Sequence, residues 1–195
     1  MASRVHNPSS NLRLRSGVGR VDALRAAGVH VALGLDQAGL DDDQDPYTEM
    51  RLALRLAGVV HDGPTLGARD VLMMATTAGA GTTGFEDAGR IVVGAAADLV
   101  VVDLDRPSSP WLHPEVAPCD LVVHRIQPVD VVHVVTDGIV RVRDRQLVGV
   151  DVDGLRDEFA EHLAVGAGAD LAGGRALAAA VRRWFDDWRS SGDPR

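Results

Sequence analysis

The chain has 195 residues, of which 46% are hydrophobic and 25% charged, as is typical of a soluble globular protein with one large or two small domains. Its formal charge of −8 excludes an extended nucleic-acid-binding surface, because neutralising phosphates requires clustered cations, and its single cysteine, Cys119, excludes an internal disulfide. No apolar run approaches the ~18 residues of a membrane span and no signal-peptide pattern follows Met1, so we expect a cytoplasmic protein.

The first predicted structured segment is one helix followed by one strand. Residues 1–17 are polar and rich in turn-forming types, so we expect a loop there. The pattern then predicts a helix from Val18 to Ala27, ended by Gly28, and a buried strand from Val29 to Leu33. Asp36 follows that strand, where barrel and doubly wound α/β folds place their chemistry, and is the first candidate catalytic residue.

An acidic loop, residues 37–45, comes next. Its D-x-D-x-D spacing matches the opening of a calcium-binding EF-hand loop. Pro46 stands where that loop needs glycine, and Leu52 stands where it needs a bidentate glutamate, which excludes calcium binding of this kind. We therefore expect a solvated loop whose last residue, Asp45, caps a helix that runs to Ala57.

A third helix is predicted from Gly67 to Ala80, with core-facing residues that include Val71 and Met74. Residues 79–84 read G-A-G-T-T-G and formally match a dinucleotide-binding fingerprint. That fingerprint must link a strand to a helix, whereas this stretch closes a helix, so we exclude the function.

The pattern changes to short β-rich runs after Arg90 and returns to helix after residue 150. The final helix carries an apolar stripe that ends in Trp184 and Trp188. The predicted strands are Ile91–Val93, Leu99–Val102, Leu121–Val123, Val131–Val135, Ile139–Val142 and Gln146–Val150.

Four motifs occur in an order that resembles a known family. Residues 6–17 read H-N-P-S-S-N-L-R-L-R-S-G and residues 34–37 read G-L-D-Q. Residues 94–103 read G-A-A-A-D-L-V-V-V-D and residues 135–144 read V-T-D-G-I-V-R-V-R-D. Together they are similar to segments of the amidohydrolase superfamily, in its cytosine deaminase-like and chlorohydrolase-like branch.

The resemblance implies an α/β fold in three parts. Residues 1–89 would form the end of a metal-dependent hydrolase (β/α) barrel, residues 90–150 part of a composite β-sandwich domain, and residues 151–195 a C-terminal helical segment. A complete barrel takes about 250 residues, so we expect only the C-terminal part of the family fold.

The resemblance also implies a chemistry. In this family a divalent metal, zinc or iron, activates water for attack on a carbon that carries a nitrogen or halide leaving group. Asp36 matches the aspartate that binds the metal and takes the proton, whereas His6 and Asn11 match residues that face the substrate pocket. Taken in isolation, an Asp after a strand is more often a turn or N-cap residue, but the flanking motifs outweigh this alternative for Asp36. For His6 and Asn11 the alternatives of a loop histidine and a turn former are nearly as favoured.

Two departures from the family pattern limit this expectation. Gln37 stands in place of a glycine, and the H-x-H motif and the two further histidine ligands are absent. A zinc site usually takes three or four protein ligands, so we expect no activity from this chain alone. Five other histidines lack the H-x-H or H-E-x-x-H spacing of metal ligands and are expected to be structural: His30, His61, His113, His124 and His133.

Two functional hypotheses remain. In the first, the chain belongs to a hydrolase that acts on carbon–nitrogen bonds other than peptide bonds in a small heterocycle. Either a complementing N-terminal chain supplies the missing strands, or the chain is a truncated gene product, or the sequence is incomplete; a homo-oligomer is a further possible partner. In the second, it is a non-catalytic remnant or interaction domain that packs on a partner. We also expect the predicted strand Val29–Leu33 to expose an unpaired edge and apolar surface, which favours association.

Overall fold

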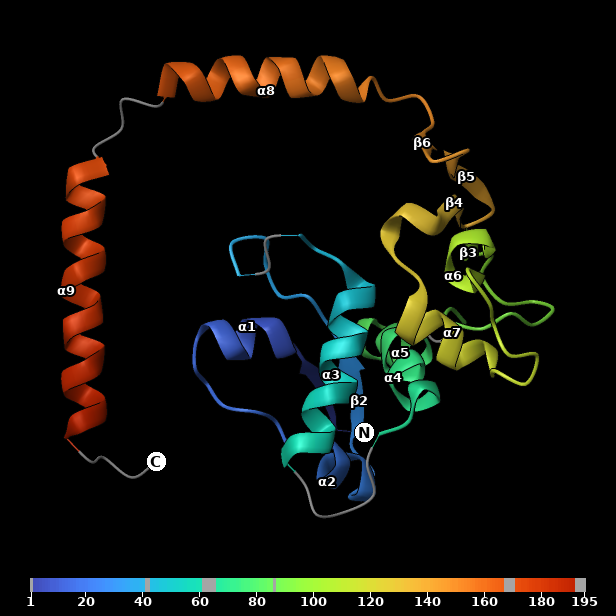
Figure 1. Cartoon of the computed structure of the whole chain (residues 1–195), viewed down its shortest axis with the longest axis horizontal. Coiled ribbons are helices and arrows are strands. Elements are labelled where there is room, and N and C mark those ends of the chain that lie inside the picture. The colour runs from blue at the N-terminus through green and yellow to red at the C-terminus, as the bar shows by residue number, and fades with distance from the viewer. Residues whose placement is uncertain (1, 41–42, 61–65, 86, 167–170, 192–195) are drawn as a thin grey trace. The chain divides into compact units, whose positions relative to one another are not determined.

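The computed structural model describes residues 2–40, 43–60, 66–85, 87–166 and 171–191 (Figure 1). The chain divides into two compact units, residues 1–148 and residues 149–195, which are described separately. The first unit mixes helices and strands, which confirms the expected α/β class in its broad sense. No helix within the described ranges is long and apolar enough to cross a membrane.

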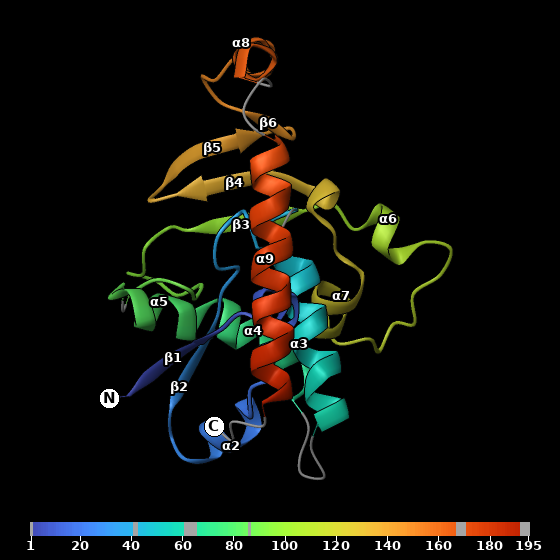
Figure 2. The same ribbon diagram turned by 90° about the vertical axis from the view of Figure 1, so that its left-hand side faces the viewer.

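The first unit begins with two parallel strands, β1 (Ser3–His6) and β2 (His30–Leu33), paired so that Ser3 lies opposite His30 and His6 opposite Leu33 (Figure 2). Helices α1 (Pro8–Arg13) and α2 (Val21–Ala26) lie between them in the sequence. The expected loop over residues 1–17 is therefore wrong. β1 has almost no apolar pattern of its own, and its extended form comes from pairing with β2.

Three helices follow β2: α3 (Pro46–Val60), α4 (Ala68–Ala75) and α5 (Thr77–Thr83). Helices α4 and α5 pack against β2. The predicted single helix from Gly67 to Ala80 is broken at Thr76, whose φ of −120° and ψ of −92° lie outside helical values. The hydrophobic core lies among these elements and includes Val31, Met50, Val71, Met74 and Val123.

The remaining strands of the first unit form one antiparallel sheet in the order β3-β4-β5-β6. Their bounds are Leu99–Val102, Val131–Thr136, Ile139–Arg143 and Gln146–Leu147. This sheet is a single layer, so the described residues supply one sheet of the two that a sandwich needs. The predicted strand Ile91–Val93 is wrong: the segment is irregular and exposed, and no neighbouring strand pairs with it in the described residues. The last strand is shorter than predicted.

The long connection between β3 and β4 holds α6 (Asp105–Ser108), α7 (Pro118–Arg125) and a 3₁₀ turn (Pro128–Asp130). The predicted strand Leu121–Val123 is wrong, because these residues belong to α7. Pro118 favours a helix start, and Leu121 and Val123 are buried where α7 packs on α3 and α4. A short apolar run is read equally well as strand or buried helix until its neighbours are known.

The second unit contains α8 (Val152–Gly166) and α9 (Leu171–Ser190). In α9 the predicted apolar stripe exists, but its side chains are exposed, with Trp184 64% accessible. The rings of Trp184 and Trp188 stack with centroids 6.4 Å apart.

Candidate functional site

The parallel pair brings two chemistry-bearing segments to one edge of its sheet. Asn7 directly follows His6 at the carboxyl end of β1, and Gly34 to Asp36 follow the carboxyl end of β2. Because the strands are parallel and in register, these two segments emerge side by side. Ligand and catalytic sites of α/β folds lie at this edge.

Gly34 allows the two segments to approach closely. A Cβ atom at Gly34 would lie 2.5 Å from Asn7 Oδ1 and 2.7 Å from Val5 Cγ1, which is closer than real contacts permit. When its nitrogen faces β2, the Asn7 side-chain amide donates to the Gly34 carbonyl oxygen at 3.1 Å. The glycine in this motif is thus required by the approach of the β1 end.

Asp36 is held by a serine from α1. Its backbone is left-handed, with φ of +66°, a conformation that aspartate tolerates better than most residues, and its side chain is exposed. The Ser10 hydroxyl donates to Asp36 Oδ2 at 2.6 Å, and Ser10 itself is buried. One carboxylate oxygen is therefore fixed in position at the strand edge.

Glu49 of α3 anchors the same helix through Ser9. Only 1% of Glu49 is exposed. Its Oε1 accepts a hydrogen bond from the Ser9 backbone N–H at 2.9 Å, and its Oε2 accepts a short one from the Ser9 hydroxyl. Sequence reasoning missed both Glu49 and Ser10. Ser10 lies inside the first motif, whereas nothing in the sequence around Glu49 indicates that it is buried.

His6 and Asn11 lie near this edge without joining Asp36. His6 is 7% exposed and its ring packs against Gly19. Burial lowers the pKa of the His6 imidazole below its ordinary value, which favours the neutral ring. The Asn11 backbone N–H donates to the Asn7 carbonyl oxygen at 2.9 Å. In the described part of the chain no hydrogen bond links the three side chains, so their predicted roles at one site stay predictions.

The acidic loop is used for capping, as expected. Asp45 is buried, and it accepts hydrogen bonds from the Tyr47 N–H at 2.8 Å and the Thr48 hydroxyl at 2.5 Å. It also pairs with Arg51 at 3.5 Å. Asp43 is exposed, and the other two acids of the run, residues 41 and 42, lie outside the described residues, as does His61.

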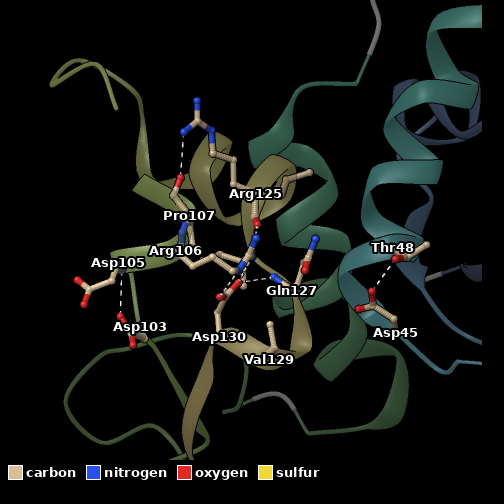
Figure 3. A network of polar contacts seen from close by, with 12 residues as sticks. Asp45, Thr48, Asp103, Asp105, Arg106, Pro107, Arg125, Gln127, Val129 and Asp130 are labelled. Atoms are coloured by element: carbon tan, nitrogen blue, oxygen red, sulfur yellow. Dashed lines mark hydrogen bonds and ion pairs between the residues drawn. The ribbon is translucent and has the colours of Figure 1, made fainter. Parts of the chain in front are cut away.

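A second polar network lies beside the antiparallel sheet (Figure 3). Asp130 is buried and accepts hydrogen bonds from Arg106 Nε at 2.6 Å and from the Gln127 N–H at 2.8 Å. Arg106 also donates to the Arg125 carbonyl oxygen at 2.8 Å. Mainly because of the Arg106 hydrogen bonds, the pKa of Asp130 is lowered. These groups satisfy one another and tie α6, the end of α7 and the 3₁₀ turn before β4 together, so we assign the network a structural role.

The described residues do not fit a metal ion by themselves. No group of three or more His, Cys, Asp or Glu side chains converges anywhere in the ranges that the structure describes. Asp36 offers a single carboxylate, and zinc sites usually take three or four protein ligands. Within the described residues, the carboxyl ends of the two parallel strands present one carboxylate, Asp36, whose Oδ2 is held by Ser10.

Comparison with known proteins identifies the family. A family model described as the amidohydrolase family matches residues 1–141. The chain is 42% identical over 162 residues to a 5-methylthioadenosine/S-adenosylhomocysteine deaminase of Halobacterium salinarum, covering 82% of this chain and 36% of that protein. It is 39% identical to a 5'-deoxyadenosine deaminase of Methanothermobacter thermautotrophicus, covering 86% of this chain and 38% of that protein. The chain belongs to the amidohydrolase family, which confirms the resemblance of its motifs.

Solved structures agree with this. A zinc-bound adenosine deaminase from Xanthomonas campestris superposes with a TM-score of 0.75 at 34% identity, covering 82% of this chain and 36% of that one. An atrazine chlorohydrolase from Arthrobacter aurescens superposes with a TM-score of 0.72 at 24% identity, over 80% of this chain and 35% of that one, and shows likeness of fold alone. The chain thus spans little more than a third of the relatives' length.

Proposed function

We propose that this chain is the C-terminal part of a metal-dependent amidohydrolase that deaminates an adenine-type nucleoside. The observation that carries the proposal is the Asp36 carboxylate, fixed by Ser10 at the carboxyl end of a parallel strand pair. The relatives that match most of this chain are named as deaminases of adenosine derivatives, which supports a substrate of that class. Hydrolytic deamination breaks a carbon–nitrogen bond outside a peptide.

In this proposal β1 and β2 are the last two strands of the barrel, and Asp36 is both a metal ligand and the proton acceptor. A carboxylate that already receives the Ser10 hydroxyl on one oxygen has lone pairs left to take a proton from the attacking water. His6 and Asn11 would face the substrate. His6 would do so as a neutral ring, since its burial disfavours the charged form.

The remaining ligands must come from residues that this chain does not contain. The relatives support a divalent metal, and one solved relative carries zinc. One carboxylate cannot hold either zinc or iron firmly. We therefore propose that residues N-terminal to this segment, in the same polypeptide or in a complementing one, supply the remaining ligands, with the cytoplasm as the place of action.

A second candidate function is a non-catalytic interaction domain. It is favoured by the apolar side chains that the antiparallel sheet leaves exposed, including Val100, Ile139 and Leu147.

Measuring the metal content distinguishes the two candidate functions. Stoichiometric zinc or iron in the chain combined with an N-terminal segment of a relative, together with release of ammonia from adenosine derivatives, supports the hydrolase. Association without metal or turnover supports the interaction domain.

Asp36→Asn in that combined enzyme tests the role of the carboxylate. Asparagine keeps the size, one oxygen donor and the tolerance of a left-handed backbone, but it lacks the charge and the proton-accepting oxygen. We expect turnover to fall by about 10²-fold or more, in line with the loss of a general base. Asp43→Asn is the matched control, because this exposed loop carboxylate should leave turnover unchanged. Near-normal turnover by Asp36→Asn would show that Asp36 is only a turn-forming residue and would contradict its proposed role as proton acceptor.

A further inference from the structure

Glu49 is a buried carboxylate whose two oxygens both contact one residue, Ser9. It lies on α3, forty residues along the chain from Ser9, and both of its oxygens accept hydrogen bonds from Ser9. Burying a carboxylate is costly unless it is hydrogen-bonded, and an apolar side chain would fill the same space without that cost. The group is therefore suited to fixing the position of Ser9 rather than to packing.

Ser9 is covalently next to the residue that holds Asp36. Ser10 is buried and donates its hydroxyl to Asp36 Oδ2 at 2.6 Å. Both serines belong to α1, which is only 6 residues long. Such a short helix has little stability of its own, so the direction of the Ser10 hydroxyl depends on what anchors the helix.

We propose that Glu49 is a positioning residue for Asp36, acting through Ser9, α1 and the Ser10 hydroxyl. The functional meaning of this inference rests on the proposed role of Asp36, although the mechanical connection does not. Gly34 supports the same arrangement from the other strand, because it lets the β1 end that precedes α1 lie against the β2 end that carries Asp36.

The connection is tested in the whole chain by backbone amide resonances in a ¹H–¹⁵N spectrum. Glu49→Gln keeps one acceptor oxygen and replaces the other by an amide nitrogen, which cannot accept a hydrogen bond from Ser9. We expect the resonances of Asp36 and Gln37 to shift together with those of Ser9 and Ser10. Glu115→Gln, at an exposed glutamate in the same unit, is the matched control and should leave all four in place.

A second pair of variants covers the case in which Glu49→Gln does not fold. Ser9→Ala removes the hydroxyl but keeps the backbone N–H that donates to Glu49, whereas Ser9→Thr keeps both donors. We expect Ser9→Ala to move the Asp36 resonance and Ser9→Thr to restore it. If the Ser9 and Ser10 resonances shift while Asp36 and Gln37 stay fixed, Glu49 anchors only α1 and the proposal is overturned.

The kinetic readout distinguishes this inference from the proposed function itself. In the combined enzyme we expect Glu49→Gln to lower kcat more than it changes KM, because the misplaced group is Asp36 and not a substrate contact. If Asp36→Asn abolishes turnover while Glu49→Gln leaves kcat unchanged, the positioning role fails and the hydrolase function stands. If the resonances respond but Asp36→Asn is active, the mechanical connection stands and the hydrolase mechanism fails.

Discussion

Gly34 stands where the ends of β1 and β2 approach each other closely. The two strand ends approach there so closely that a side chain of any size would displace Asn7 and Val5. Two residues further on, Asp36 has a left-handed backbone. The end of β2 is therefore restricted both by the close contact at Gly34 and by the backbone conformation of Asp36.

Gly34→Ala is therefore expected to destabilise the chain. The added Cβ would force Asn7 and the β1 end to move, at a cost of about 1–3 kcal/mol, the usual range for overpacking. Gly39→Ala is the matched control, since no heavy atom lies within 4 Å of a Cβ placed there. Urea unfolding measures both, and equal midpoints for the two variants would contradict the close approach.

At the scale of elements, α3 is defined by its cap. Asp45 accepts a hydrogen bond from the Tyr47 N–H, which satisfies one of the backbone donors that the first helical turn leaves open, and a second from the Thr48 hydroxyl. We expect Asp45→Ala to lower the free energy of unfolding by about 0.5–2 kcal/mol. Asp43→Ala, two residues earlier and exposed, should change it little. The comparison by chemical denaturation fails to support the cap if both variants behave alike.

The Arg106–Asp130 network gives the antiparallel sheet a dependence on pH. Since the folded pKa of Asp130 lies below the ordinary value of about 3.9, the unfolded state takes up a proton first as pH falls. The stability that this ion pair contributes is complete above about pH 5 and is lost as pH falls through the unfolded and then the folded pKa.

Asp130→Asn should remove that dependence. We expect the difference in unfolding free energy between the parent chain and Asp130→Asn to be largest near neutral pH and to shrink below about pH 4. Asp87→Asn, at an exposed carboxylate, is the control. Thermal melts between neutral and acidic pH measure the effect, and a difference that grows on acidification would have the wrong sign.

At the scale of the whole molecule, the first unit exposes an unpaired strand edge and apolar side chains of its antiparallel sheet within the described residues. Within the described residues β2 pairs only with β1, and the antiparallel sheet leaves Val100 56% exposed. Unpaired strand edges and apolar patches favour association. We expect sedimentation velocity to show association that increases with concentration.

Val100→Lys should weaken that association, because it places a charge on the exposed sheet face. Val59→Lys is the control, since Val59 is a still more exposed valine (81%) that lies in the last turn of α3 rather than on the sheet. A monomer at all concentrations in the parent chain, with a sharp two-state melt, would contradict the prediction.

Local chemistry in the sequence determined several features correctly. The order of the four motifs indicated the family, and Asp45 before Pro46 predicted the start of α3. The two predicted apolar runs Val131–Val135 and Ile139–Val142 became β4 and β5. Asp137 and Gly138 between them both have positive φ, as a tight hairpin turn needs. These features depend on residues that are neighbours in the chain.

The tertiary structure decided what the sequence left open. β1 is a strand because β2 lies beside it, and α7 is a helix because α3 and α4 bury Leu121 and Val123. The contacts of Glu49 with Ser9 and of Ser10 with Asp36 join segments 40 and 26 residues apart. Local propensity and motif spacing cannot predict contacts between residues so far apart in the sequence, because burial and hydrogen-bond partners exist only once the chain has folded.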